Sequence, residues 1–272
     1  MLKLTNYIKP VGVVFCNNSS LINKPKSWTI FINWTKALHT DFTKRSQDVA
    51  QKQNQDITLM DFKGEWPLEE LTKFKCDMKI FPDFITELEE TQLFEEVEPY
   101  MKRLRYEYDH WDDAIHGFRE TERKHWYPHN RAVLDRVSQV GFDSEIMPYI
   151  HILDLAPQGV IKPHVDSTRY CGHTIAGLSL LSDAVMRLVR TQVSTETTTN
   201  NNQEDAYRSQ PKAILENNFY VDILLPRRSL YIMSHTSRYN FTHEILANEA
   251  SKFQGQPLTK ERRISIICRN DP

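Results

Sequence analysis

The chain has 272 residues, of which 40% are hydrophobic and 11% aromatic, so it can bury one sizeable core and is unlike a disordered or fibrous protein. Its formal net charge of -2 excludes the strong positive field that many nucleic-acid-binding proteins carry over their whole surface. Four cysteines lie far apart, which gives no pattern for a zinc site or a disulfide framework: Cys16, Cys76, Cys171 and Cys268.

The N-terminal segment is basic and contains no acidic residue before Asp41. Basic, acid-poor and serine-containing N-termini are typical of import signals, and a disordered polar tail is the alternative. We predict a transit peptide and polar linker over 1–58 and one folded domain over 59–272. No apolar run approaches the roughly 18 to 20 residues that cross a bilayer, so no membrane span is expected.

Two amphipathic helices are predicted in the first half of the domain. Over 82–105, apolar residues recur at three- and four-residue spacing, and Pro99 is expected to kink or split this helix. Over 130–140, Val133, Leu134 and Val137 share one face, and Asn130 is a candidate N-cap. Both helices should pack on a sheet.

From Met147 onward the hydrophobic period changes to two, which is typical of strands. Several short strands at close spacing favour a sandwich or jelly-roll barrel over alternating strand-helix units. A polar run over 193–210 interrupts them and is predicted to be a flexible insertion loop. The expected strands cover 149–155, 173–181, 184–192, 218–226, 229–234 and 262–269.

A candidate metal site begins at His164 and Asp166, because residues two apart on an extended strand point to the same side. His243 is a suitable third donor from a distant part of the chain. Two imidazoles and one carboxylate form the facial triad of non-haem Fe(II) oxygenases. A histidine bonded to a neighbouring aspartate is also a common structural feature, so the pair alone does not decide the matter.

The last predicted strand places Arg263, Ser265 and Arg269 on one face. Arginines seldom point into a barrel without a partner, and a dicarboxylate would supply one through paired hydrogen bonds. Because the two arginine Cα atoms lie about 20 Å apart, both reach one small ligand only if their side chains lean towards each other. A salt bridge closing the barrel end is the alternative for Arg269. Tyr231 could donate its hydroxyl to the same carboxylate, or be an ordinary core residue.

Read in order, these residues resemble the AlkB family of Fe(II) and 2-oxoglutarate-dependent dioxygenases, and are most similar to its mitochondrial member. The family pattern is HxD, a distal His, and RxNxxxxR or a relative of it. The matches here are His164-x-Asp166, His243, and Arg263-x-Ser265-x-x-x-Arg269, in which Ser265 replaces Asn. The likeness covers roughly 62–270. It is carried by HWDDAIHGFRETER, IKPHVDS, CGHTIAGLSLLSDAVMRLVRTQ, PRRSLYIMSHTSRYNFTHEI and RRISIICR.

The resemblance implies a mainly β, double-stranded β-helix with buttressing helices on one sheet. It also implies an enzyme of the mitochondrial matrix that uses Fe(II), 2-oxoglutarate and dioxygen, with a regulatory role in programmed necrosis and fatty-acid metabolism. The iron ligands would be His164, Asp166 and His243. The 2-oxoglutarate contacts would be Tyr231, Arg263, Ser265 and Arg269.

Three kinds of substrate remain open. Base-repairing relatives carry an Asn and a Tyr at the positions of Leu153 and Leu155, and leucines cannot read a base edge by hydrogen bonds, which favours a protein hydroxylase. We expect the protein to be a monomer. Demethylation of mitochondrial RNA is the alternative. Basic and aromatic residues over 116–126 could grip phosphates and stack bases, or form a solvated helix face: Arg119, Arg123, Lys124 and Trp126. A non-catalytic 2-oxoglutarate and metal sensor is the third possibility.

Overall fold

The computed structural model describes residues 55–108, 110, 113–191 and 219–272. These belong to the unit Gln53–Pro272. The predicted transit peptide, most of the linker and the 193–210 insertion lie outside the described residues. Among the described helices, none is long and apolar enough to cross a membrane.

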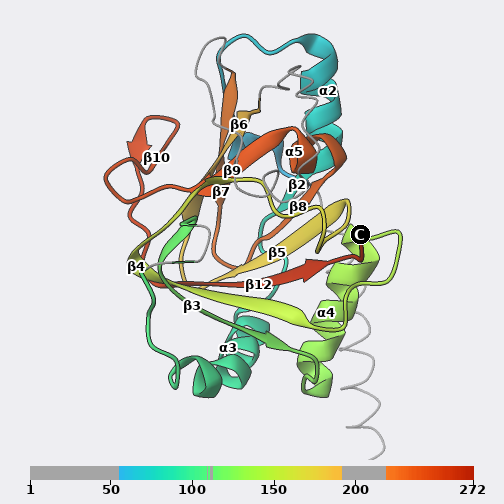
Figure 1. Cartoon of the computed structure of the whole chain (residues 1–272), viewed down its shortest axis with the longest axis vertical. Helices are drawn as coiled ribbons and strands as arrows, with labels where there is room; N and C mark the ends of the chain where they lie inside the picture. Colours follow the sequence, from blue (N-terminus) through green and yellow to red (C-terminus); the bar gives the residue numbers. More distant parts are fainter. Residues whose placement is uncertain (1–54, 109, 111–112, 192–218) are drawn as a thin grey trace, which may run out of the picture. The chain divides into compact units, whose positions relative to one another are not determined.

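A curled antiparallel sheet dominates the described part, with the strand order β1-β7-β6-β9-β4-β12-β5-β8-β2 and β3 paired to β4 (Figure 1). A short pair, β10 and β11, stands apart from it. The strands are β1 Met60–Lys63, β2 Met78–Phe81, β3 Ile115–Arg123, β4 Ile150–His164, β5 Thr174–Leu180, β6 Ala184–Arg190, β7 Tyr220–Leu225, β8 Leu230–Ser234, β9 Phe241–Ile245, β10 Lys252–Phe253, β11 Gln256–Pro257 and β12 Arg263–Arg269.

The long strand β4 makes the sheet curl. Its first half pairs with β12 through 151–155, whereas its second half pairs with β9 through Ile161 and His164. β4 therefore belongs to both walls of the barrel: the larger wall, made of β3, β4, β12, β5, β8 and β2, and the smaller wall, made of β4, β9, β6, β7 and β1. This arrangement confirms the predicted mainly β double-stranded β-helix. The sequence pattern located β5 to β8 and β12 to within a few residues and also located the start of β4.

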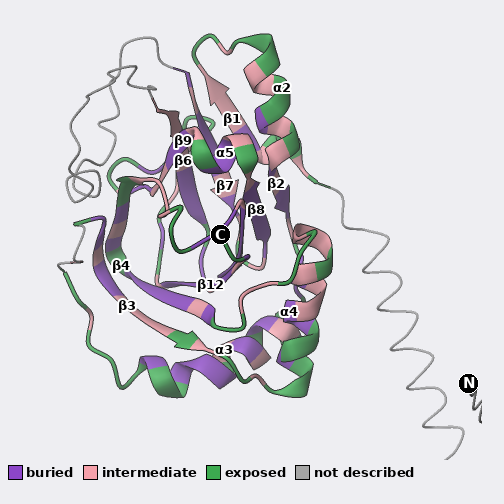
Figure 2. Ribbon diagram, turned by 45° about the vertical axis from the view of Figure 1, so that its right-hand side comes forward, coloured by how far each residue is buried: buried purple, intermediate pink, exposed green. Residues whose placement is uncertain are grey.

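Hydrophobic residues form two cores, one on each side of the larger wall. The inner core lies between the walls and includes Leu153, Leu155 and Ile267. The outer core lies between the larger wall and the helices, and the alternate residues Ile264 and Ile266 of β12 belong to it. In Figure 2 the helix faces turned towards the sheet are buried. Strand β12 is thus covered on both faces, as its alternating pattern predicted.

The helices are η1 Ile57–Leu59 (a 3-10 turn), α2 Leu68–Asp77, α3 Glu87–Met101, α4 Pro128–Gly141 and α5 His235–Tyr239. Helix α3 starts at a capping box in which Thr86 and Glu89 bond to each other's backbone N–H. Pro99 does not split the helix into two elements, because it lies in the last turn and helix α3 ends two residues later.

The prediction that Asn130 caps the second helix is wrong. Helix α4 begins two residues earlier, after Tyr127, with Pro128 in its first turn, where a missing N–H costs nothing. Asn130 is instead buried inside the helix and donates to the carboxylate of Glu96 at 2.6 Å. It joins α4 to α3.

The charged segment 116–126 is mostly strand, so its reading as a solvated helix face is wrong. Arg119 and Arg123 leave the outer face of β3 and pair with the buried carboxylates of Asp154 and Glu96, both at 2.7 Å. Charge alternation along the segment reflects these pairs rather than a helix surface. The strand adds a second partner to β4 on the larger wall.

Candidate metal centre

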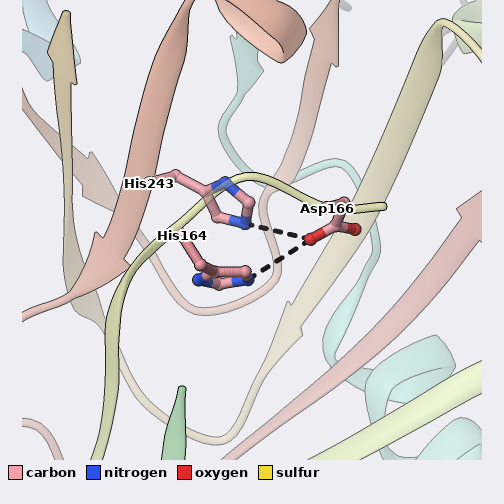
Figure 3. A group of neighbouring side chains, drawn as sticks. All are labelled: His164, Asp166 and His243. Carbon is pink, nitrogen blue, oxygen red and sulfur yellow. Dashed lines mark ion pairs between the residues drawn. The ribbon is translucent and has the colours of Figure 1, made fainter. Parts of the chain in front are cut away.

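The three predicted metal ligands meet at one end of the barrel. His164 ends β4, and its register partner on β9 is His243. Opposite residues of an antiparallel pair point to the same side, so the two imidazoles share a face. Asp166 follows β4 by two residues and turns back towards them, as Figure 3 shows.

The ligand atoms are close enough for one ion. Asp166 Oδ1 lies 3.3 Å from His164 Nε2 and 3.6 Å from His243 Nε2. All three candidate ligand atoms lie within 4.8 Å of one another. Two atoms that bind one metal ion at about 2.1 Å and at right angles stand about 3 Å apart, so a small inward movement completes a facial triad.

The protonation of these groups suits metal binding. Burial and the charge of neighbouring His164 lower the pKa of His243 to about 3, so its imidazole is neutral at physiological pH. Burial raises the pKa of Asp166, but the hydrogen bond with His164 and the charge of Arg269 outweigh it and hold the pKa well below its usual range. The site therefore presents a neutral imidazole beside a carboxylate anion.

A backbone contact fixes the orientation of His164. Its Nδ1 lies 2.8 Å from the carbonyl oxygen of Lys162, which can only accept, so Nδ1 carries the proton. In the neutral imidazole, Nε2 then has the lone pair that a metal ion requires. Metal-binding histidines are commonly oriented in this way by a second partner.

Arg269 reaches the other side of the same carboxylate. Its Nη2 lies 3.3 Å from Asp166 Oδ2, whereas Oδ1 faces the two histidines. The alternative predicted for Arg269 was a salt bridge that closes the barrel end. The structure shows a salt bridge, and its partner is the predicted metal ligand Asp166. The guanidinium holds the carboxylate in the orientation that turns Oδ1 towards the two histidines.

Arg263 is buried in the barrel without a carboxylate partner among the described residues. It is 2% exposed, and its guanidinium donates to Ser265 and, at 2.8 Å, to Ser179. Its Nε has no partner among the described residues, and burial lowers its pKa. Because the side chain leans along β12 towards Ser265, it points in the direction of Arg269, as a shared ligand requires.

Tyr231 is buried and is influenced by the charges of both arginines. Burial raises the pKa of its hydroxyl, and the charges of Arg263 and Arg269 counteract this in part. Tyr231 is opposite Gly177 in the β5 and β8 pair, and a Cβ on Gly177 would stand 2.4 Å from the tyrosine ring. The glycine therefore makes room for the ring, and the hydroxyl stays protonated and able to donate.

Three contributors escaped the sequence reasoning. The Lys162 carbonyl leaves no trace in residue type, and Ser179 and Gly177 look like ordinary strand residues. The only available signal was the glycine in the middle of a strand, which often marks a close approach.

The chain is similar to curated proteins over most of its length. It is 47% identical over 204 residues to "Alpha-ketoglutarate-dependent dioxygenase alkB homolog 7, mitochondrial" of Bos taurus, covering 74% of this chain and 82% of the relative. The Mus musculus protein of the same name is 44% identical, with the same coverage. The chain belongs to the AlkB homolog 7 family of dioxygenases. No protein-family model matches it.

Among solved structures, OsALKBH1 resembles the chain with a TM-score of 0.46 at 10% identity, covering 77% of this chain and all of the other. Membership of the AlkB homolog 7 family makes the protein a 2-oxoglutarate-dependent dioxygenase, since alpha-ketoglutarate and 2-oxoglutarate are one compound. Its cofactors are Fe(II), 2-oxoglutarate and dioxygen. Both relatives are named mitochondrial, in agreement with a mitochondrial address.

Proposed function

We propose that His164, Asp166 and His243 hold the iron of this AlkB homolog 7 family member, and that the enzyme hydroxylates a protein side chain. The convergence of the three ligand atoms within 4.8 Å is the observation that carries the metal assignment. Two nitrogen donors and one oxygen donor on one face leave three positions open, which suits Fe(II) with a bidentate cosubstrate.

Arg263 supplies the anchor for the far carboxylate of 2-oxoglutarate. A buried guanidinium without an anion costs several kcal/mol, so an anionic ligand fits this position better than water does. Ser265 and Ser179 orient the guanidinium by accepting hydrogen bonds from it. Tyr231 donates its hydroxyl to the same carboxylate.

Arg269 completes the site in a different way from Arg263. It holds Asp166 Oδ2, so its first role is to fix the carboxylate that faces the iron. Its Nε has no partner among the described residues and remains able to donate to the near end of the cosubstrate.

The bound Fe(II), with 2-oxoglutarate and dioxygen, supplies the oxidation of a C–H bond, releasing succinate and carbon dioxide. The protein's own residues fix the geometry and exclude water. His243 acts as a neutral ligand rather than as an acid or base, since its pKa is too low for proton transfer near neutrality. Leu153 and Leu155 form an apolar wall of the barrel interior, on the face that carries Arg263 and Ser265.

A protein substrate is favoured over methylated RNA, because the described residues offer few groups that would bind a base or a phosphate. The wall leucines present no hydrogen-bonding groups to a base. Arg119 and Arg123, which could have gripped phosphates, are committed to Asp154 and Glu96 on the outer face. We place the enzyme in the mitochondrial matrix as a monomer, with the regulatory role in programmed necrosis and fatty-acid metabolism that the family resemblance implied.

The decisive experiment measures succinate by mass spectrometry after incubation with Fe(II), ascorbate, 2-oxoglutarate and oxygen. We expect turnover by the wild-type protein and its loss in Asp166→Ala and Arg263→Ala. Asp135→Ala, a half-exposed aspartate of α4 paired with Arg131, is the matched control and should keep full turnover.

Metal binding without any succinate would favour the sensor alternative. Turnover that survives Asp166→Ala would refute the metal assignment. Formaldehyde release from a methylated mitochondrial RNA, without oxygen gain by any protein, would favour the demethylase alternative.

A further inference from the structure

A second polar cluster lies inside the barrel, and the proposed mechanism does not use it. Glu120 on β3 pairs in register with Leu153, which in turn pairs with Ser265 on β12. Opposite residues point to the same side, so Glu120 shares the concave face with the inner core and with the arginine face of β12. Neighbouring strands are about 4.8 Å apart, which puts the Glu120 backbone about 10 Å from that of Ser265.

One carboxylate oxygen of Glu120 accepts a hydrogen bond and the other does not. Oε2 lies 2.8 Å from His151 Nε2. Oε1 is 3.7 Å from His110 Nε2, which is within ion-pair distance of a protonated imidazole but beyond hydrogen-bond range, and it accepts no hydrogen bond from the described residues. The Glu120 side chain is 37% exposed although it faces the concave side, whereas His151 is 15% exposed. A partly exposed carboxylate, one oxygen of which accepts no hydrogen bond from the described residues, thus lines the interior.

The cluster is electrostatically connected to the metal centre. The pKa of Glu120 is lowered, first by the hydrogen bond with His151 and further by the positive charge of Arg269, so the carboxylate is ionised. Arg269 also bonds Asp166. His151 is opposite Ile267 on β12, two residues before Arg269 on the same face. Glu120 and His151 therefore lie on the same face of the sheet as Arg269, which bonds the proposed metal ligand Asp166.

From this geometry we infer that Glu120, positioned by His151, binds a cationic N–H donor of the substrate, namely the ammonium or guanidinium group of a Lys or Arg side chain. This inference rests on the protein hydroxylase proposed above and names the residue class that enters the site. Any substrate that covers Glu120 removes water from an ionised carboxylate, which is unfavourable unless a donor replaces it. A cationic donor replaces that water best, because it gives a charge-assisted hydrogen bond.

The same charge disfavours a nucleic acid as the occupant. A phosphate group beside Glu120 would face a like charge in a partly buried site, where repulsion is less screened than in water. A polypeptide carrying a basic side chain meets no such barrier.

The test uses pools of short peptides that are random except for a central residue, which is Lys, Arg, norleucine or Glu. Each pool is incubated with the full-length enzyme, Fe(II), 2-oxoglutarate and oxygen, and both succinate and oxygen gain by the peptides are measured. We expect the Lys or Arg pool to stimulate succinate about tenfold more than the Glu pool, which corresponds to one charge-assisted contact.

Three variants locate the effect. Glu120→Gln should remove most of the preference for basic pools, Glu120→Lys should reverse it towards the Glu pool, and His151→Leu should weaken it by freeing the carboxylate. Glu122→Gln is the matched control, because Glu122 is an exposed glutamate two residues further along the same face of β3, and it should keep the wild-type preference. Every variant is first tested for Mn(II) and 2-oxoglutarate binding by thermal shift, which establishes that it is folded.

A preference for basic pools that survives Glu120→Gln would overturn the inference, as would the absence of stimulation by any pool. Stimulation by a methylated RNA oligonucleotide above every peptide pool would also overturn it. Succinate formed without peptide reports on the iron and 2-oxoglutarate sites alone. Its absence in the wild-type protein would instead refute the proposed function, so the two failures are distinguishable.

Discussion

Replacement of Arg263 by methionine should abolish stabilisation by 2-oxoglutarate while leaving the ligand-free protein nearly as stable as before. The substitution removes a buried guanidinium that has no carboxylate partner among the described residues, which is favourable by several kcal/mol. It also removes hydrogen bonds to Ser265 and Ser179, each contributing about 1.5 to 3 kcal/mol. The two effects nearly cancel, and we expect a change within about 1 kcal/mol.

The ligand effect is much larger. At a concentration 100 times its Kd, a ligand stabilises the folded protein by about 2.7 kcal/mol, which raises the Tm of a domain of this size by roughly 5 to 10 °C. Loss of a buried charge partner costs the bound carboxylate about 3 to 5 kcal/mol and weakens binding by a factor of 100 or more. At the same 2-oxoglutarate concentration the increase should then fall to about 1 °C.

The assay compares Tm with Mn(II) alone and with Mn(II) plus 2-oxoglutarate, so that only the cosubstrate increment is measured. Arg136→Met is the control, because it breaks a half-buried pair with Glu89 between α3 and α4, away from the barrel interior. It should lower Tm but keep the increment. An undiminished increment in Arg263→Met would refute the assignment of the anchor, and so would the absence of any increment in the wild-type protein.

Three further outcomes are expected. In metal-free protein the pKa of His243 is about 3, so the unfolded chain takes up a proton near pH 6.5 while the folded chain does not. The free energy of unfolding should therefore fall by about 1.4 kcal/mol per pH unit as the pH decreases from about 6.5 towards 3. Urea unfolding of His243→Gln should show a weaker dependence of this free energy on pH. Gly177→Ala should displace the Tyr231 ring, raise the KM for 2-oxoglutarate and cost about 1 to 3 kcal/mol in chemical denaturation; an unchanged KM would contradict the packing. Arg262→Ala leaves the buried Asp154 with one fewer cation and should lower the free energy of unfolding by about 2 to 3 kcal/mol. A change below about 0.5 kcal/mol, which is typical of surface substitutions, would contradict this.

Local patterns predicted most of the barrel because its strands obey them. β12 alternates from Arg263 to Ile266, since one face turns into the barrel and the other meets the helices, so a period of two survives in that part of the sequence. The HxD pair was readable for the same reason, because both residues follow one extended segment. Its partner His243 was proposed as a third donor from a distant part of the chain, and the family pattern agreed, although its strand β9 was not predicted.

Other features depend on contacts between distant segments. β3 looks like a charged surface segment because Arg119 and Arg123 are neutralised by residues 35 and 27 positions away, and no local period records such partners. The Asn130 error has the same origin, since its amide bonds Glu96 on another helix rather than its own backbone. The bond between Arg269 and Asp166 likewise spans 103 positions and appears only when the barrel closes.

Burial of β12 on both faces gives the helical layer an influence on cosubstrate affinity. Ile264, Ile266 and Cys268 pack in the outer core with residues of α4 such as Leu134, while their neighbours in the strand turn towards the barrel interior. A compound that inserted between α4 and the sheet would shift the proposed anchor Arg263 without entering the cavity. Such an inhibitor would lower the affinity for 2-oxoglutarate without occupying its site, and 2-oxoglutarate would lower the affinity for the inhibitor by the same factor. Selectivity could then come from the helices, which need not resemble those of other dioxygenases that share the iron ligands.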